Sequence, residues 1–222
     1  MDYHGSSQQA ELTGKRVVSY GCYIKSDFSF TCDNIGTISG FFIGGRKYAV
    51  KSSLISRFNA YNITGAIAIC VKLGIPVEVV IEALTHFVTV PGRLEVLITA
   101  NNISCYVDYA HTDDALKCSL IALKGINPSA LIVVFGCGGD RDKTKRPRMG
   151  KVASEEADVI IITDDNPRIE NSGDIINDIL SGIVSTDSIK VVSDRKKAIS
   201  YAVSIATSDD IILTTGKGYE DY

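Results

Sequence analysis

The chain has 222 residues, enough for one large domain or two small ones. Its 23 lysines and arginines nearly balance its 26 acidic residues, and the formal charge of −3 gives no reason to expect a nucleic-acid partner. Hydrophobic residues make up 45% of the chain and charged residues 22%, which excludes a disordered protein.

Nothing in the sequence indicates a membrane protein or a secreted one. There is no apolar run of ~18 residues, and the N-terminus lacks the apolar segment of a signal peptide. The six cysteines are scattered, with no C-x-x-C pair and no histidine beside them, so we expect reduced thiols and no metal site. We therefore expect a cytoplasmic protein, and we expect it to be a monomer.

The first part of the chain predicts strands followed by two helices. Residues 17–55 are rich in β-branched and aromatic residues with glycines at the turns, and we expect these strands to pair antiparallel. Residues 57–73 then have helical spacing and end at Gly74. A second helix begins at Pro76. The apolar faces of the two helices are predicted to be Ala60, Ile63, Ile67 and Cys70, and Val79, Val80, Ala83 and Leu84.

Pro91 and Gly92 break this pattern, and we place a domain boundary near residue 90, giving domains over 1–89 and 90–222. After the boundary, short apolar runs alternate with helices, which predicts a parallel sheet covered on both faces. The fold class is therefore α/β: a Rossmann-like C-terminal domain with a mostly parallel sheet, preceded by antiparallel strands and two helices. We expect strands at 94–99, 103–109, 130–135, 158–162, 189–192 and 211–213, and helices at 113–124, 148–157, 172–184 and 194–207.

Ligands bind at the carboxyl ends of the strands in such a sheet. Four predicted strand ends carry polar loops, which begin at His111, Gly136, Asp164 and Gly216, and we expect these loops to converge on one pocket. Each loop also has a plain structural explanation. Residues 136–139 suit a tight turn, residues 165–168 an ordinary turn, and His111 a helix cap.

The chemistry of these loops indicates a zwitterionic ligand. The basic run at 141–148 opens a helix, where amides and arginine forks suit anions, although it also suits a solvated face. A fixed arginine reads a carboxylate, whereas Asp and Asn read an ammonium. The glycine turn does not fit the dinucleotide fingerprint, so no redox cofactor is indicated. We expect carboxylates of the ligand to face Arg141 and Arg168, and its amino group to face Asp165, Asn166 or Glu220.

Five segments together resemble the C-terminal domain of the Mur ligases. They are VPGRLE (90–95), VDYAHTDDAL (107–116), FGCGGDRDKTKRPRMG (135–150), TDDNPRIE (163–170) and GKGYE (216–220). Residues 57–69 are similar to the last part of that family's central ATPase domain, so the resemblance makes 1–89 a partial ATPase domain. Within the family the MurE type is most similar. It implies that ATP activates the D-Glu carboxylate of UDP-MurNAc-L-Ala-D-Glu as an acyl phosphate, which the amine of an incoming amino acid attacks.

The resemblance also implies the amino acid and the roles of the site residues. The DNPR loop is carried by ligases that add meso-diaminopimelate, and lysine-adding relatives differ there. Lysine lacks the distal carboxylate of diaminopimelate, so Arg168 would be left without a partner. The implied amino-acid site is Arg141, Asp165, Asn166, Pro167, Arg168, Gly216 and Glu220; the implied ATP contacts are Asn62, Arg93 and Asp108; and His111 is the motif histidine near the nucleotide.

The sequence contains no G-x-x-x-x-G-K-[ST] loop for the phosphates of ATP and no segment that resembles the family's UDP-sugar-binding domain. We therefore expect a truncated ligase that is inactive alone, with ATP and Mg²⁺ as cofactors of the full-length enzyme. Two alternatives remain open. One is a lysine-adding Mur ligase, and the other is a non-catalytic module that binds an amino acid or a partner protein.

Overall fold

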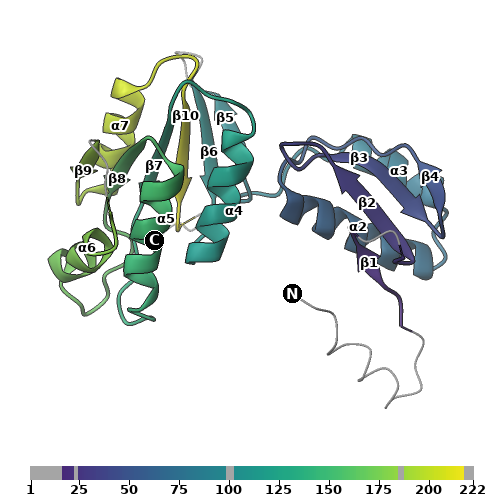
Figure 1. The fold of residues 1–222 in the computed structure, drawn as a ribbon, viewed down its shortest axis with the longest axis horizontal. Helices are drawn as coiled ribbons and strands as arrows, with labels where there is room; N and C mark the ends of the chain where they lie inside the picture. The colour runs from purple at the N-terminus through teal and green to yellow at the C-terminus, as the bar shows by residue number, and fades with distance from the viewer. Residues whose placement is uncertain (1–16, 23–24, 99–102, 185–187, 218–222) are drawn as a thin grey trace. The chain divides into compact units, whose positions relative to one another are not determined.

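The computed structural model describes residues 17–22, 25–98, 103–184 and 188–217. The chain divides into two compact units, Met1–Val88 and Thr89–Tyr222, and each is described by itself (Figure 1). Across the described ranges, no helix combines the length and apolar character that crossing a membrane requires.

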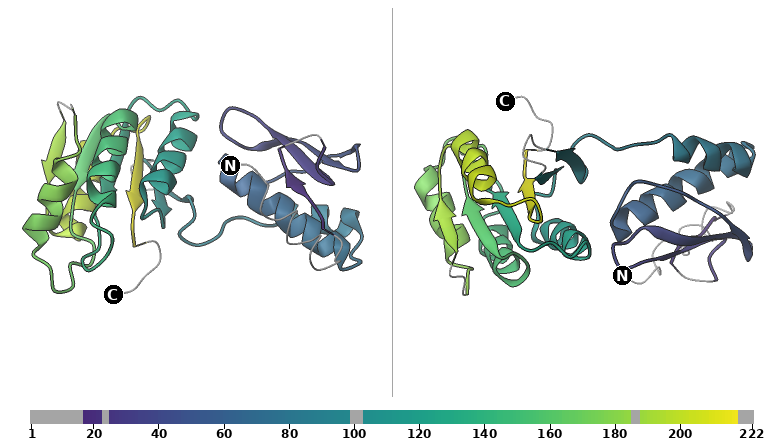
Figure 2. Two further views of the ribbon diagram at one scale, coloured as in Figure 1. Left: turned by 60° about the horizontal axis from the view of Figure 1, so that its bottom comes forward. Right: turned by 90° about the horizontal axis from the view of Figure 1, so that it is seen from above.

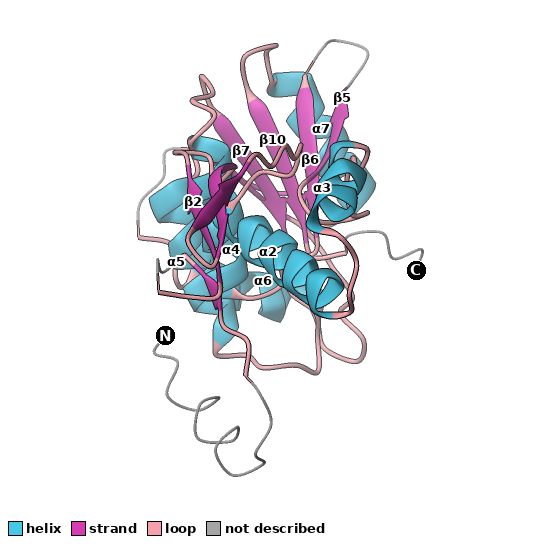
Figure 3. Ribbon diagram, turned by 90° about the vertical axis from the view of Figure 1, so that its right-hand side faces the viewer, coloured by secondary structure: helices cyan, strands magenta, loops and turns pink. Residues whose placement is uncertain are grey.

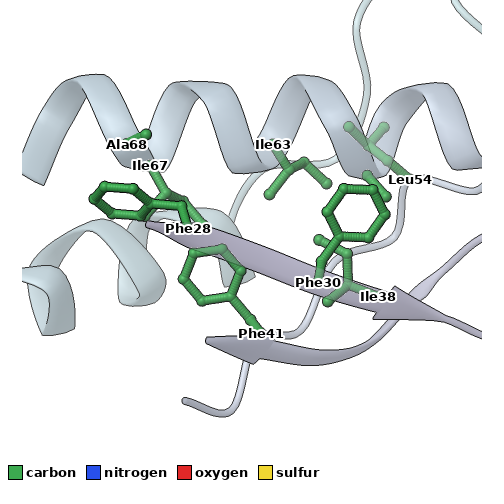
Figure 4. Close-up of a cluster of buried hydrophobic side chains, with 9 residues drawn as sticks. Phe28, Phe30, Ile38, Phe41, Leu54, Ile63, Ile67 and Ala68 are labelled. Carbon is green, nitrogen blue, oxygen red and sulfur yellow. The ribbon is translucent and has the colours of Figure 1, made fainter. Parts of the chain in front are cut away.

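The first unit is a four-stranded sheet packed on a long helix. A buried cluster that includes Phe28, Phe41 and Ile67 lies between the sheet and α2 (Figure 4). The sheet order is β1-β2-β3-β4. The elements are β1 (Tyr20–Gly21), β2 (Phe28–Cys32), β3 (Ile38–Ile43), β4 (Arg46–Tyr48), α2 (Arg57–Lys72) and α3 (Val77–Thr85).

The expectation of antiparallel pairing is confirmed for β2, β3 and β4 and is wrong for β1, which pairs parallel to β2. The chain returns after β1 and starts β2 beside Ser19. The Asp27 carboxylate accepts hydrogen bonds from the Ser19 backbone N and Oγ, at 2.8 and 2.9 Å. The N–H of Phe28 donates to the Ser19 carbonyl at 3.1 Å. These local side-chain bonds replace the hairpin that the strand pattern alone implied.

The predicted apolar face of α3 is half right. Val80 and Leu84 pack against the core, whereas Val79 is 57% exposed and Ala83 is also exposed. The two pairs form adjacent rows along the helix, each with i, i+4 spacing. Contact with α2 buries one row only, and the sequence of α3 itself does not indicate which.

The second unit is an α/β Rossmann-like fold around a six-stranded sheet of order β5-β6-β10-β7-β8-β9. Strand β5 pairs antiparallel with β6, and the other described pairings are parallel. Figure 3 shows β5, β6, β10 and β7 side by side. The strands are β5 (Glu95–Ile98), β6 (Ser104–Asp108), β7 (Leu131–Phe135), β8 (Val159–Ile162), β9 (Ile189–Val191) and β10 (Ile211–Thr215).

Helices cover both faces of this sheet, as the sequence predicts. The helices are α4 (Asp113–Lys124), α5 (Lys145–Glu156), α6 (Ser172–Leu180) and α7 (Arg195–Ile205). Helices α4, α5 and α6 lie side by side on one face, and α7 packs on β7, β8 and β10 from the other (Figure 2). Helix α5 begins earlier than predicted because Pro147 fits its first turn, where no helical N–H is lost.

Candidate functional site

A cavity of about 370 Å³ lies at the carboxyl ends of the parallel strands in the second unit. Its wall is formed by residues that follow β6, β7, β8 and β10, so the predicted convergence of the four loops is confirmed. The lining residues are Tyr109, His111, Gly138, Arg141, Lys145, Asp165, Asn166, Arg168 and Gly216.

Two of these loops are joined through their backbones. The N–H of Gly139 donates to the Asn166 carbonyl at 2.8 Å, and Arg168 Nη1 donates to the Gly139 carbonyl at 2.5 Å. A Cβ atom at position 139 would lie 1.9 Å from the Pro167 carbonyl oxygen. Glycine is therefore required at 139 by the close approach of the two loops, which holds the residues before Arg141 against the DNPR loop.

Several charged side chains that line the cavity have no ion-pair partner among the described residues. The side chains of Arg141 and Asp165 make no hydrogen bond or ion pair with any residue in the described ranges, and both line the cavity. Lys145 Nζ donates to the His111 carbonyl at 2.8 Å. The cavity thus presents cationic groups and one carboxylate, a set that matches carboxylate and ammonium groups on a ligand.

The basic run at 141–148 divides between the cavity and the protein itself. Arg141 and Lys145 line the cavity. Arg148 pairs with Asp113 and Asp142, Lys143 pairs with Glu170, and Arg146 is fully buried. Two members of the run therefore line the cavity, and the other three pair with carboxylates of the protein.

Hydrogen bonds within the DNPR loop hold its conformation. Asn166 Oδ1 accepts a hydrogen bond from the Arg168 N–H at 3.2 Å, which helps to hold Arg168 at φ 52°. The Asn166 oxygen therefore shapes the turn, and Asn166 also lines the cavity. Pro167 is not among the cavity-lining residues, and its carbonyl accepts from the Glu170 N–H at 3.0 Å.

His111 stands exposed at the cavity. Its Nδ1 lies 2.9 Å from the Tyr109 carbonyl oxygen, and its ring meets the Tyr109 ring edge to face at 5.1 Å. It does not cap α4, because the Thr112 hydroxyl accepts the hydrogen bond from the Ala115 N–H. The helix-cap explanation of His111 is therefore wrong.

The residues expected at the nucleotide are not part of this cavity. Asn62 is exposed on α2 in the first unit, and Arg93 is exposed with its guanidinium 5.3 Å from the centre of the Tyr109 ring. Asp108 is buried, and its carboxylate accepts from the N–H groups of Leu94 and Ala110 and from the Ser119 hydroxyl. Burial raises the pKa of Asp108, and these three hydrogen bonds oppose that shift. Its observed role is to hold the segments around it. Glu220 lies outside the described residues.

Arg195 is a residue that the motif reasoning missed. It begins α7, and its Nη2 donates to the Thr215 carbonyl at 2.6 Å beside the cavity-lining Gly216. Its Nη1 is buried and finds no hydrogen-bond partner among the residues that the structure describes. Burial lowers the pKa of Arg195, and the charge of Asp165 opposes that shift. Asp194, a helix-capping residue shortly after β9, was the available signal for its position.

Cys137 lies within the glycine loop but is not poised as a nucleophile. It is buried, and its Sγ donates to Met149 Sδ at 3.6 Å. Burial raises the pKa of this thiol to about 11, so it is almost fully protonated at neutral pH. Within the ranges that the structure covers, no group of three or more His, Cys, Asp or Glu side chains is placed to hold a metal ion.

The fold is an α/β domain with a cavity at the carboxyl edge of its sheet, and this cavity is lined by arginines, a lysine and a carboxylate. Residues 92–218 match the family of Mur ligase glutamate ligase domains. The chain therefore belongs to the Mur ligase family.

Curated relatives and solved structures agree with this assignment. The UDP-N-acetylmuramoyl-L-alanyl-D-glutamate--2,6-diaminopimelate ligase of Fusobacterium nucleatum is 47% identical over 78% of this chain and 36% of its own length. The ligase of the same name from Thermosynechococcus vestitus is 39% identical over 100% of this chain and 46% of its own length. A solved ligase of that name matches all of this chain and 47% of its own with a TM-score of 0.64 and 30% identity. The chain spans less than half the length of the curated relatives it matches.

Proposed function

We propose that this chain is part of an ATP-dependent Mur ligase, and that its second unit binds meso-diaminopimelate, the amino acid to be joined. The observation that carries the proposal is the cavity where Arg141, Arg168 and Asp165 meet. The relatives named above carry diaminopimelate in their names, and their similarity covers this part of the chain.

The proposed roles follow from the charges. Diaminopimelate has a distal amino-acid head with a carboxylate and an ammonium. The carboxylate would lie against Arg168 and Arg141, and the ammonium against Asp165, whose oxygens have no other donor among the described residues. Lysine has the same chain without the distal carboxylate, and it would leave Arg168 without an anionic partner. That loss gives the site a reason to reject lysine.

Fewer observed contacts support the proposed binding of ATP. Arg93 is exposed above the Tyr109 ring, where its guanidinium is open to the ribose or phosphate of ATP. Asn62 is exposed on α2, where its amide would contact the adenine. His111 lines the cavity, and we assign it the place of the motif histidine near the nucleotide. ATP would supply the activation of the D-Glu carboxylate, and Mg²⁺ would accompany it in the complete enzyme.

Calorimetric titration of the 222-residue chain with meso-diaminopimelate and with L-lysine tests the proposal. A charged hydrogen bond contributes about 1.5–3 kcal/mol, so we expect diaminopimelate to bind at least about 10-fold more tightly than lysine. Equal affinities, or a preference for lysine, would favour the lysine-adding alternative. Binding of neither amino acid would remove the support for an amino-acid site in this unit.

A further inference from the structure

Arg146 is the largest fully buried side chain among the described residues, and it is charged. Its Nη1 donates to Glu170 Oε2 at 3.0 Å and to Asp178 Oδ2 at 2.9 Å. Its Nη2 donates to Glu170 Oε1 at 2.8 Å and approaches the Gly138 carbonyl at 3.4 Å. The guanidinium therefore forms a bidentate pair with Glu170 while it contacts the glycine loop.

The Glu170 carboxylate also contacts two nitrogen donors in the loop that carries Arg141. Lys143 Nζ lies 2.9 Å from Oε2, and the Asp140 N–H donates to Oε1 at 2.5 Å. Arg146, and then these two groups, lower the pKa of Glu170 to about 2, so its carboxylate is charged throughout the neutral range. Residues 140 and 143 flank Arg141, and Glu170 follows Arg168 by two positions. The carboxylate thus joins the two loops that bear the ligand-facing arginines.

Packing alone does not explain why an ion pair, rather than apolar residues, occupies this position. A buried ion pair is often no more stabilising than apolar residues of similar volume, because both charges lose their hydration. Here the pair contacts the two loops whose arginines, Arg141 and Arg168, line the same cavity and carry like charges. Holding two like charges at a fixed separation requires rigid support behind them, since a binding group displaced by about 1 Å loses much of its effect.

We propose that Arg146 and Glu170 are a positioning pair that sets the separation of Arg141 and Arg168, and with it the selectivity of the cavity for a ligand with a distal carboxylate. This inference rests on the proposed function. Neither residue lines the cavity, so the pair acts through the two loops rather than by contact with the ligand.

The test compares Glu170→Gln with Asp178→Asn in the full 222-residue chain, titrated with meso-diaminopimelate and L-lysine at pH 7.5. Both substitutions remove one carboxylate from Arg146 and keep the size of the side chain. Of these two carboxylates, Glu170 is the one that bonds to the loop of Arg141, whereas Asp178 lies on α6. We expect Glu170→Gln to weaken diaminopimelate binding about 10-fold or more, with less than about a twofold change for lysine. Asp178→Asn should preserve the ratio of the two affinities.

If the Arg146–Glu170 pair only stabilises the fold, the two variants should show a different pattern of stability and affinity. Both variants would then unfold at lower temperature, and the ratio of the affinities of the folded protein would stay at the wild-type value in each. That result would overturn the inference. If Glu170→Gln does not fold, Lys143→Met takes its place, because Lys143 is 66% exposed and pairs with the same carboxylate. A selective loss of diaminopimelate binding then supports the inference, and an unchanged ratio overturns it. Wild-type chain that does not prefer diaminopimelate contradicts the proposed function itself.

Discussion

Arg168→Met is expected to lower the affinity of the chain for meso-diaminopimelate at least about 10-fold. A hydrogen bond to a charged group contributes about 1.5–3 kcal/mol, and the variant loses the bonds between Arg168 and the distal carboxylate. The affinity for L-lysine should change little, since lysine offers no distal carboxylate. The variant is therefore expected to lose most of its discrimination between the two amino acids, measured by calorimetry.

Arg148→Met is the matched control. Arg148 is also an exposed arginine of the second unit, but it pairs with Asp113 and Asp142 and does not line the cavity. Arg168→Lys separates charge from shape, because a lysine keeps the charge but cannot form the bidentate fork. Diaminopimelate binding that survives Arg168→Met unchanged would show that the distal carboxylate lies elsewhere.

Gly139→Ala is expected to destabilise the second unit and to disrupt the cavity together. The new Cβ would lie 1.9 Å from the Pro167 carbonyl oxygen, so the glycine loop and the DNPR loop must separate. Inserting a methyl group into a packed contact costs about 1–3 kcal/mol, and here the obstacle is backbone that cannot rotate away. Chemical denaturation should report a lower free energy of unfolding for this unit, and diaminopimelate binding should fall by about 10-fold or more.

Gly138→Ala provides the comparison within the same loop. The nearest atom to a Cβ at 138 is Arg168 Nη1 at 3.1 Å, the end of a flexible side chain. We expect little loss of stability in this variant. Equal stabilities of the two alanine variants would contradict the role assigned to the contact between Gly139 and Pro167.

The sheet and the position of the site were predictable because they depend on local patterns. Apolar runs of strand length, separated by helical stretches, determine a parallel sheet, and ligand sites on such sheets lie at the carboxyl ends of the strands. Helix α4 was predicted with its observed bounds, since Thr112 and the two acidic residues after it mark its start. The same reasoning placed Arg141, Asp165 and Arg168 at this edge of the sheet, where they line the cavity.

What could not be predicted depends on contacts between distant segments. The buried row of α3 depends on its contact with α2. In the sequence, Arg146 is indistinguishable from the solvated arginines of the basic run. In the structure it is buried and forms ion pairs with Glu170 and Asp178. The buried Nη1 of Arg195, which has no hydrogen-bond partner in the part of the chain that the structure describes, likewise depends on the packing of α7 against β10.

The most direct test of the account is a crystal structure of the chain with meso-diaminopimelate. We predict that the distal carboxylate lies within hydrogen-bonding distance of the guanidinium of Arg168 or Arg141, and that the ammonium beside it contacts Asp165. Diaminopimelate bound outside this cavity, or bound inside it with its distal carboxylate away from both arginines, would contradict the account.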